Sequence, residues 1–482
     1  MGAALVRSCW SCGKAIPRAD RHCEQCGADQ WNPPQGKGGS GYRFGREVMN
    51  KGGSVKNPML RSVFRVLIFS ALIGNAALSI ARAISNSVAS TGGIDFHTYW
   101  RGGLLFRQRI DPWNGTMDSV AVDVPVTHLI GSHTEVVPVP PFGYVERLGI
   151  TAPLELVVMG LTWFSWDVAK VVWLAFNIVA WGVAPYLAVR LARQYGIHLS
   201  TSSAWSVGLL FWGMLSSRVV IGNGQSTIIV VSLMLGAMLL GDSSSRLNRI
   251  AGGLLLGFAL SKPTIALAAL PVLGLRRRFD VIVIGLSVQL LGLIAAAAIS
   301  RSNPFSVLQG YLRVLQHHGG IDDVMNLAQS PLTMNQSRIG LTFVAIGTLT
   351  ILVLLRHSLI RRIQETTGNG KYDFDLFALI AIWSLLATYH WFYDAVLAIP
   401  VLVIGVVWLE KRPWPPGGSV GWFGRALAAI CLAIPLIPGN ILNPILPSHW
   451  SINWEVVLTA SYTVVLLVLI VFISLRLRHF YA

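Results

Sequence analysis

The chain has 482 residues, of which 53% are hydrophobic and only 12% are charged. Soluble domains carry about 25% charged residues, so this composition excludes a large soluble protein and predicts an all-α, multi-pass protein of the cell membrane. A net charge of +16 can indicate a nucleic-acid-binding protein. Here, however, the basic residues fall mostly in short clusters between apolar runs, as in the cytoplasmic loops of membrane proteins. We therefore expect no nucleic-acid partner.

Four of the five cysteines lie in residues 1–30, which we interpret as a zinc ribbon. They form two Cys-x-x-Cys pairs, Cys9/Cys12 and Cys23/Cys26, and a glycine follows each pair. Four thiolates at this spacing predict a tetrahedral structural zinc site, whereas two disulfides or four free thiols are the alternatives. A closed four-cysteine site has no open coordination position, so we expect it to support folding or to bind a cytoplasmic protein partner.

Residues 31–60 are rich in Gly and Lys and predict a flexible linker. The rest, 61–482, predicts one membrane domain with about twelve membrane segments. Its first span, roughly 63–84, carries Arg61 and Arg65 at its start, which places the N-terminus in the cytoplasm. No cleavable signal peptide is expected, because the chain before this span is polar.

Residues 149–165 decide the topology, because they are apolar but short and carry Glu155. They could cross the membrane or lie along its surface. We favour the surface position, because it leaves more arginines in the cytoplasm. It requires 250–275 to be a broken pair of short helices. Both termini are then cytoplasmic, and the long loops 85–148 and 301–338 are outside. The later segments are 169–191, 204–217, 226–241, 250–260, 263–275, 279–300, 339–356, 374–388, 391–409, 424–437 and 454–474.

Ionisable side chains cluster in the outer segment that directly follows the first span. Asp95 could act as a general base, or it could cap the N-terminus of a helix over Phe96–Arg107. Tyr99 and Arg101 are further candidates for a site. Asp111, which precedes Pro112 and Trp113, is interpreted mainly as a residue that shapes the loop.

Two motifs at the ends of later apolar segments also face outward in this topology. Asn223 and Gln225 lie in a Gly-x-Gly turn, where carboxamides could bind sugar hydroxyls or only satisfy the turn. Lys262 interrupts an apolar run, which costs a few kcal/mol unless the ammonium is paired or near water. Pro263 after it starts a new helix. We expect Lys262 to bind a lipid phosphate; the alternative is a lysine that snorkels to the interface.

Three more residues are candidates for binding the phosphate or the sugar. His390 and Asp394 are one helical turn apart and share a face, so they could contact phosphate or sugar, or form a structural pair. Arg338 ends the second outer loop just before a span. It is a phosphate-binding candidate or an interfacial anchor.

Taken in order, these motifs resemble glycosyltransferase family 87, whose members have the GT-C fold. The resemblance covers about residues 60–475 and excludes the zinc ribbon. Trp113 is a departure, since many relatives have Tyr there, but we expect little consequence. The motifs are Asp95-Phe96-x-x-Tyr99 with Asp111-Pro112-Trp113, PVPPF at 138–142, GNGQ at 222–225, AGGLLLGFALSKP at 251–263 and YHWFYD at 389–394.

This resemblance implies an inverting transfer of a sugar, with mannose expected before arabinose, from a polyprenyl-phosphate donor. The acceptor would be a membrane lipid or a glycan at the outer face. Asp95 matches the family's catalytic aspartate. Lys262 and His390 resemble its polar positions near the donor phosphate, and Gln225, Asn223 and Asp394 are weaker carry-overs. No catalytic metal is expected.

Two other functions remain open at this point. The chain could be a flippase or transporter of lipids or glycolipids with the ribbon as a regulatory head, or a membrane scaffold whose ribbon recruits a partner. A transporter would be expected to show inverted repeats with paired broken helices. The sequence shows only one such break, at Lys262-Pro263, and no clear internal repeat.

Overall fold

The computed structural model describes residues 6–8, 15–17, 58–89, 92–113, 122–127, 132–137, 150–318, 337–365, 370–387, 392–410, 467–471, 473–474 and 477. It divides the chain into two compact units, Met1–Ile68 and Phe69–Ala482. Several predicted features lie outside the described residues: Cys9, Cys12, Cys23, Cys26, His390, and the PVPPF turn at 138–142.

Among its described residues, the Met1–Ile68 unit contains one antiparallel hairpin. Strand β1 (Val6–Ser8) pairs with β2 (Ala15–Pro17), with Val6 opposite Pro17 and Ser8 opposite Ala15. The first Cys-x-x-Cys pair falls between these strands in the sequence. Zinc binding stays a prediction, because none of the four cysteines is among the described residues.

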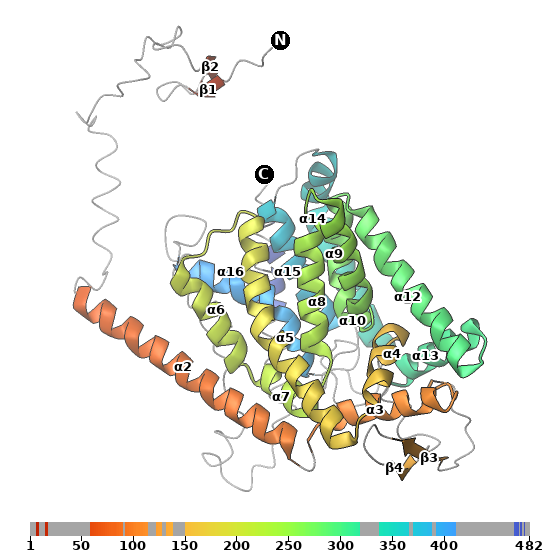
Figure 1. Cartoon of the computed structure of the whole chain (residues 1–482). Helices are drawn as coiled ribbons and strands as arrows, with labels where there is room; N and C mark the ends of the chain where they lie inside the picture. The colour runs from red at the N-terminus through yellow and green to blue at the C-terminus, as the bar shows by residue number, and fades with distance from the viewer. Residues whose placement is uncertain are drawn as a thin grey trace. The chain divides into compact units, whose positions relative to one another are not determined.

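The Phe69–Ala482 unit is built mainly from helices (Figure 1). Helix α2 (Pro58–Val88) begins in the first unit and ends in this one. The other helices are α3 (Ile94–Arg107), α4 (Ala152–Leu161), α5 (Trp166–Gln194), α6 (Thr201–Gly213), α7 (Leu215–Asn223), α8 (Thr227–Gly241), α9 (Arg246–Ala259), α10 (Pro263–Ala266), η2 (Leu267–Ala269), α11 (Leu270–Leu275), α12 (Phe279–Ser300), α13 (Pro304–His318), α14 (Ser337–Gln364), α15 (Gly370–Ala387), η3 (Phe392–Ala398) and α16 (Ile399–Glu410).

The described residues are mainly helical, as the all-α prediction expects, but the outer loop 85–148 also contains a β-hairpin. Strand β3 (Val122–Thr127) pairs with β4 (Ser132–Val137) in antiparallel register, with Val122 opposite Val137 and Thr127 opposite Ser132. Valines at every second position of β3 have the period of a strand. That signal was present in the sequence.

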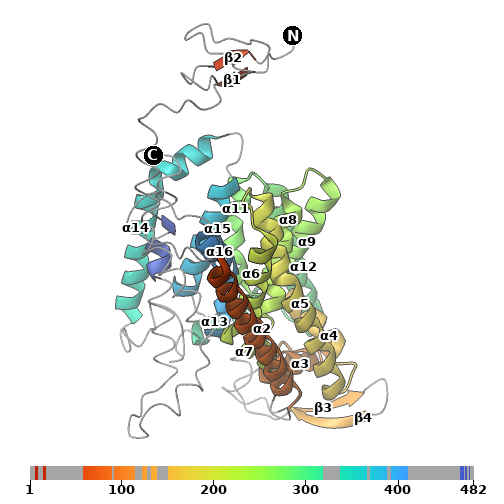
Figure 2. The ribbon, with the colours of Figure 1, turned by 90° about the vertical axis from the view of Figure 1, so that its left-hand side faces the viewer.

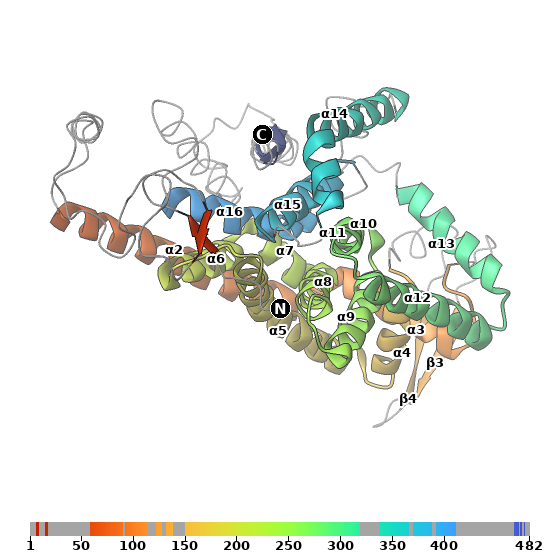
Figure 3. The same ribbon diagram turned by 90° about the horizontal axis from the view of Figure 1, so that it is seen from above.

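Helix α8 lies at the centre of the bundle, between α5 and α9 (Figure 3). It is buried along most of its length, which is typical of a helix that is apolar on all sides. The glycines of AGGLLLG explain the close approach of its neighbours. A Cβ on Gly252 would lie 2.7 Å from the Gly241 nitrogen of α8, and a Cβ on Gly257 would lie 2.4 Å from Val288 of α12. Small residues thus let α9 pack tightly between α8 and α12.

Among the described residues, the structure supports only part of the predicted set of twelve membrane segments. Four described helices are long and apolar enough to cross a membrane: Val66–Val88 of α2, all of α5 and α12, and Val344–Gln364 of α14. Helices α6 and α7, bent by 54°, make a fifth if they form one span. The twelve-segment count is not confirmed, and the predicted segment 424–437 and most of 454–474 lie outside the described residues.

The structure shows the predicted helix break within 250–275, and it shows that the helix within 149–165 is short, whereas its position at the membrane surface stays a prediction. Helix α9 ends at Ala259 and α10 begins at Pro263, so 250–275 is a broken pair of helices. Helix α4 has only 10 residues, about 15 Å, which is too short to cross a hydrocarbon core of about 30 Å. Figure 2 shows α3 and α4 at the same end of the bundle as α7 and the β3–β4 hairpin.

Candidate functional site

The start of α3 is fixed by glycines rather than by Asp95. Gly93 is the N-cap residue, with φ of 75°, and its N–H donates to the Gly222 carbonyl at 3.0 Å. A Cβ on Gly92 would lie 2.0 Å from the Asn86 carbonyl oxygen. The alternative that Asp95 caps this helix is therefore wrong. Asp95 lies in the first turn, partly exposed, where the helix dipole stabilises a carboxylate.

One turn after Asp95, Tyr99 joins α3 to the Gly-rich turn between α7 and α8. Its hydroxyl donates to Gln225 Oε1 at 2.7 Å, and both side chains are buried. Burial, and secondarily the negative charge of Asp95, raises the pKa of Tyr99 well above its ordinary value. Tyr99 is therefore a neutral hydrogen-bond donor at physiological pH. Arg101 lies half-buried on the same helix.

Gly224 holds this turn against α3 and α5. It ends α7 with φ of 67°, and its carbonyl accepts a hydrogen bond from Trp173 Nε1 at 2.7 Å. A Cβ at this position would lie 2.8 Å from the Cβ of Phe96. The GNGQ motif is thus a tight helix-ending turn, as its glycines suggest, and it also aims Gln225 at Tyr99. Asn223, the last residue of α7, is half-buried.

Replacing Gly224 with Ala should destabilise the protein by about 1–3 kcal/mol or more. The new Cβ would occupy a left-handed conformation and would clash with Phe96, so α3 must shift. The measurement is the thermal unfolding midpoint in detergent. Gly182→Ala is the matched control, because Gly182 lies inside α5 with nothing within 4 Å of a Cβ. Equal midpoints for the two variants would contradict this account.

Lys262 points into the protein at the break between α9 and α10. Its ammonium donates to Asp394 Oδ1 at 2.6 Å and to Thr227 Oγ1 at 2.7 Å. The Thr227 hydroxyl in turn donates to Asp394 Oδ1 at 2.7 Å. The Lys262 and Asp394 side chains are only 12% and 2% exposed. The alternative of a lysine that snorkels to the interface is therefore wrong.

These two clusters are joined through the turn that leads into α8 and the first residue of that helix. Gln225, which receives the Tyr99 hydrogen bond, lies two residues before Thr227, which binds Lys262 and Asp394. The structure thus brings together four predicted residues from distant parts of the chain, Tyr99, Gln225, Lys262 and Asp394, and Asp95 lies one helical turn before Tyr99. For Arg338, at the start of α14, only the backbone is described, and His390 lies outside the described residues.

Glu155 is a further candidate residue for the site. From the sequence it entered only the choice between a membrane span and a surface helix. It is completely buried in α4, and neither carboxylate oxygen has a hydrogen-bond partner among the described residues. Helix α4 packs against α3 and α12, and the N–H of Thr151 at its start donates to the Ser261 carbonyl, next to Lys262. Burial raises the pKa of Glu155 well above its ordinary value. A lone Glu in an apolar run was its sequence signal.

The substitution Glu155→Gln should stabilise the protein increasingly as pH rises above about 4.3, the ordinary pKa of Glu. Above that pH the unfolded chain loses a proton that the folded chain keeps. The wild type therefore loses up to about 1.4 kcal/mol of stability per pH unit until its raised folded pKa is reached. Gln cannot ionise and keeps its stability. Unfolding midpoints from pH 4 to pH 8 test this, and a constant offset between the two proteins would contradict it.

No protein of curated function matches the chain. A family model matches residues 153–388, just under half of the chain, from the second residue of α4 through α15. This region contains Glu155, Gln225, Thr227 and Lys262, whereas Asp95 and Asp394 lie beyond its two ends. The matching model is that of glycosyltransferase family 87, and it indicates a membrane glycosyltransferase that takes a sugar donor and an acceptor as substrates.

Proposed function

We propose that this protein transfers a sugar from a polyprenyl-phosphate donor to a lipid or glycan acceptor at the outer face of the membrane, with inversion. Mannose is the first candidate sugar. The observation that carries the proposal is a group of polar side chains. Tyr99, one turn after Asp95, is hydrogen-bonded to Gln225, and Lys262 is paired with Asp394. This group supplies a carboxylate, Asp95, and a cation, Lys262, near the end of the bundle that carries α3, α4 and α7.

In this proposal Asp95 is the general base. Its carboxylate accepts the proton of the acceptor hydroxyl while that oxygen bonds to the anomeric carbon of the sugar. The bond from this carbon to the phosphate oxygen breaks, and the phosphate leaves with the electron pair. The fixed start of α3 and the hydrogen-bonded Tyr99 support this role, because they hold the first turn in one place.

Lys262 is proposed to stabilise the negative charge that grows on the leaving phosphate. An ammonium group that is already held in position spends no free energy on reorganisation when that charge develops. Its contacts with Asp394 and Thr227 hold the ammonium in such a fixed position. Asn223 and Gln225 are proposed to bind the donor. Arg338 and His390 complete the proposed donor site, with Arg101 as a further candidate, and the proposed mechanism does not require a catalytic metal.

The test is the full chain in sealed liposomes that contain radiolabelled polyprenyl-phosphate mannose and a glycolipid acceptor. The proposal expects a new mannosyl linkage of inverted configuration and release of polyprenyl phosphate. Movement of the labelled lipid across the bilayer without a new glycosidic bond would instead identify a flippase. Product from polyprenyl-phosphate arabinose alone would assign the other donor sugar.

The zinc ribbon is proposed to bind one structural Zn²⁺ per chain and to dock a cytoplasmic partner, with both termini of the chain in the cytoplasm. Metal analysis of the purified chain should find close to one zinc, and Cys9→Ser with Cys23→Ser should abolish it. Because the site is closed and lies before α2, sugar transfer should survive that substitution. Loss of transfer would favour the scaffold function.

A further inference from the structure

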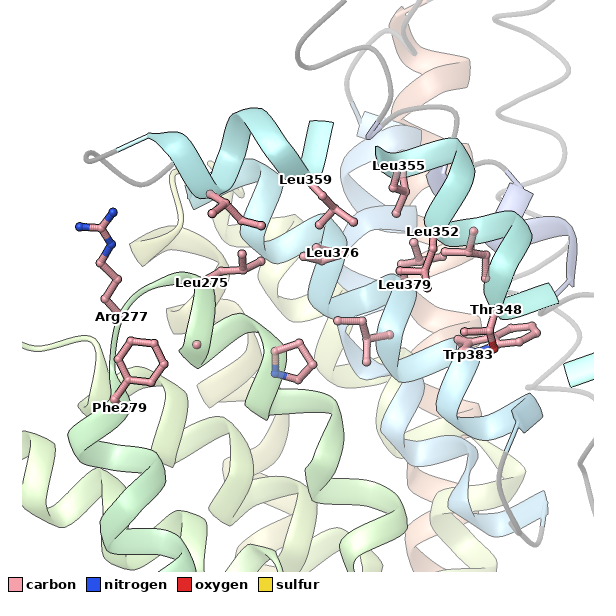
Figure 4. Close-up of a pocket in the computed structure, with 15 residues that line it drawn as sticks. Leu275, Arg277, Phe279, Thr348, Leu352, Leu355, Leu359, Leu376, Leu379 and Trp383 are labelled. Carbon is pink, nitrogen blue, oxygen red and sulfur yellow. Dashed lines mark hydrogen bonds between the residues drawn. The ribbon is translucent and has the colours of Figure 1, made fainter. Parts of the chain in front are cut away.

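An apolar groove lies between α11, α14 and α15, away from the Lys262 site. Its volume is about 580 Å³, within the range of about 300–1,000 Å³ typical of ligand sites. Figure 4 shows leucines of α14 facing leucines of α11 and α15 across it. The facing leucines are Leu352, Leu355 and Leu359 on one side and Leu275, Leu376 and Leu379 on the other.

One cation, Arg277, lines the end of this groove. It is the middle one of three consecutive arginines, and its neighbours are neutralised. Arg276 pairs with Asp242 and, at 2.7 Å, with Asp373, while Arg278 pairs with Asp242 at 3.3 Å. Arg277 is exposed and forms no ion pair with an acidic residue among the described residues. Among the described residues, no carboxylate thus neutralises this guanidinium at the rim of the apolar groove.

Arg277 lies at one end of the groove, and this end is separate from the Lys262 site. Arg277 lies between α11 and α12, and α12 runs to the end of the bundle that carries α13 (Figure 1). Lys262 precedes α10, and the helices Pro263–Leu275 separate it from Arg277, a length of about 20 Å. A phosphate at Arg277 is therefore distinct from one at Lys262. Trp383 and Thr348 line the opposite end.

The walls of this groove include surfaces suited to contact with lipid. In α14, which forms one wall, only 11% of the most apolar 18-residue stretch is buried inside the protein. We propose that the groove binds an acyl chain of an anionic phospholipid, with the headgroup phosphate on Arg277. The apolar lining fits the chain, and the guanidinium of Arg277 complements the phosphate. This site is independent of the proposed sugar transfer.

Native mass spectrometry of the full chain in detergent tests the headgroup contact. Phosphatidylglycerol and phosphatidylcholine with identical acyl chains are titrated separately. We expect one phosphatidylglycerol to bind about tenfold more tightly than phosphatidylcholine, and Arg277→Gln to remove that preference. Arg246→Gln is the matched control, because Arg246 is exposed at the start of α9 and does not line the groove. It should keep the preference.

A second pair of variants tests the acyl-chain contact. Gly274 lines the groove, and a Cβ there has nothing within 4 Å, so Gly274→Leu should fill the space and lower binding of both lipids. Gly182→Leu places the same side chain in open space on α5 and should change nothing. Unchanged phosphatidylglycerol binding by Arg277→Gln or Gly274→Leu would overturn the proposal. Displacement of phosphatidylglycerol by polyprenyl phosphate would also overturn it, because the groove would then hold the sugar donor. The binding assay contains no sugar donor, so a negative result for lipid binding does not affect the proposed sugar transfer.

Discussion

Asp95→Asn is expected to lower the rate of sugar transfer by about 10²–10⁴-fold, the usual contribution of a general base. Asn has nearly the same shape as Asp but accepts a proton poorly, so the acceptor hydroxyl would stay protonated. The start of α3 should be preserved, since it rests on Gly93 and its hydrogen bond to Gly222. The measurement is the turnover of polyprenyl-phosphate mannose in liposomes, with the unfolding midpoint recorded alongside.

The matched control for this prediction is Asp111→Asn in the same outer segment. Asp111 Oδ1 accepts a hydrogen bond from the Trp113 N–H at 2.9 Å, and the Asn carbonyl oxygen can accept it equally. This contact agrees with the interpretation of Asp111 as a loop-shaping residue. Transfer by Asp111→Asn should therefore stay near the wild-type rate. Near wild-type turnover by both Asp95→Asn and Asp95→Ala would remove Asp95 from catalysis.

Lys262→Met should both abolish transfer and destabilise the fold by about 3–5 kcal/mol. Removing the ammonium leaves the Asp394 carboxylate, which is 2% exposed, without its charged partner. Unfolding midpoints and transfer rates are measured on the same preparations. Arg249→Met is the control, because its partner Asp280 is 47% exposed. Removing a surface ion pair of this kind should cost no more than about 1 kcal/mol.

The double variant Lys262→Met with Asp394→Leu separates the structural role of Lys262 from the functional one. Replacing both buried charges by apolar side chains should recover most of the lost stability. If Lys262 binds the donor phosphate, transfer should nevertheless stay lost. Recovery of transfer together with stability would show that Lys262 acts only as the partner of Asp394.

The sequence by itself determined where most of the described helices lie and where one of them breaks. Apolar runs of helical length mark α5, α8 and α12, and Pro263 ends one helix and starts the next, because its ring excludes the preceding helical hydrogen bond. The residues of the candidate site were also visible, because charge is costly and rare in an apolar bundle. These are local properties of composition and periodicity.

Only the tertiary structure decided what these residues contact. Tyr99 and Gln225 are 126 positions apart, and Lys262 and Asp394 are 132 apart, so no local pattern pairs them. Glu155 has no hydrogen-bond partner among the described residues because α4 packs against α3 and α12, and Gly93 replaces Asp95 as the N-cap because α3 starts against Gly222. Periodicity records which face of a segment is apolar. The packing of helices that are far apart in the sequence decides which polar side chains contact each other, and in this protein those contacts form the candidate site.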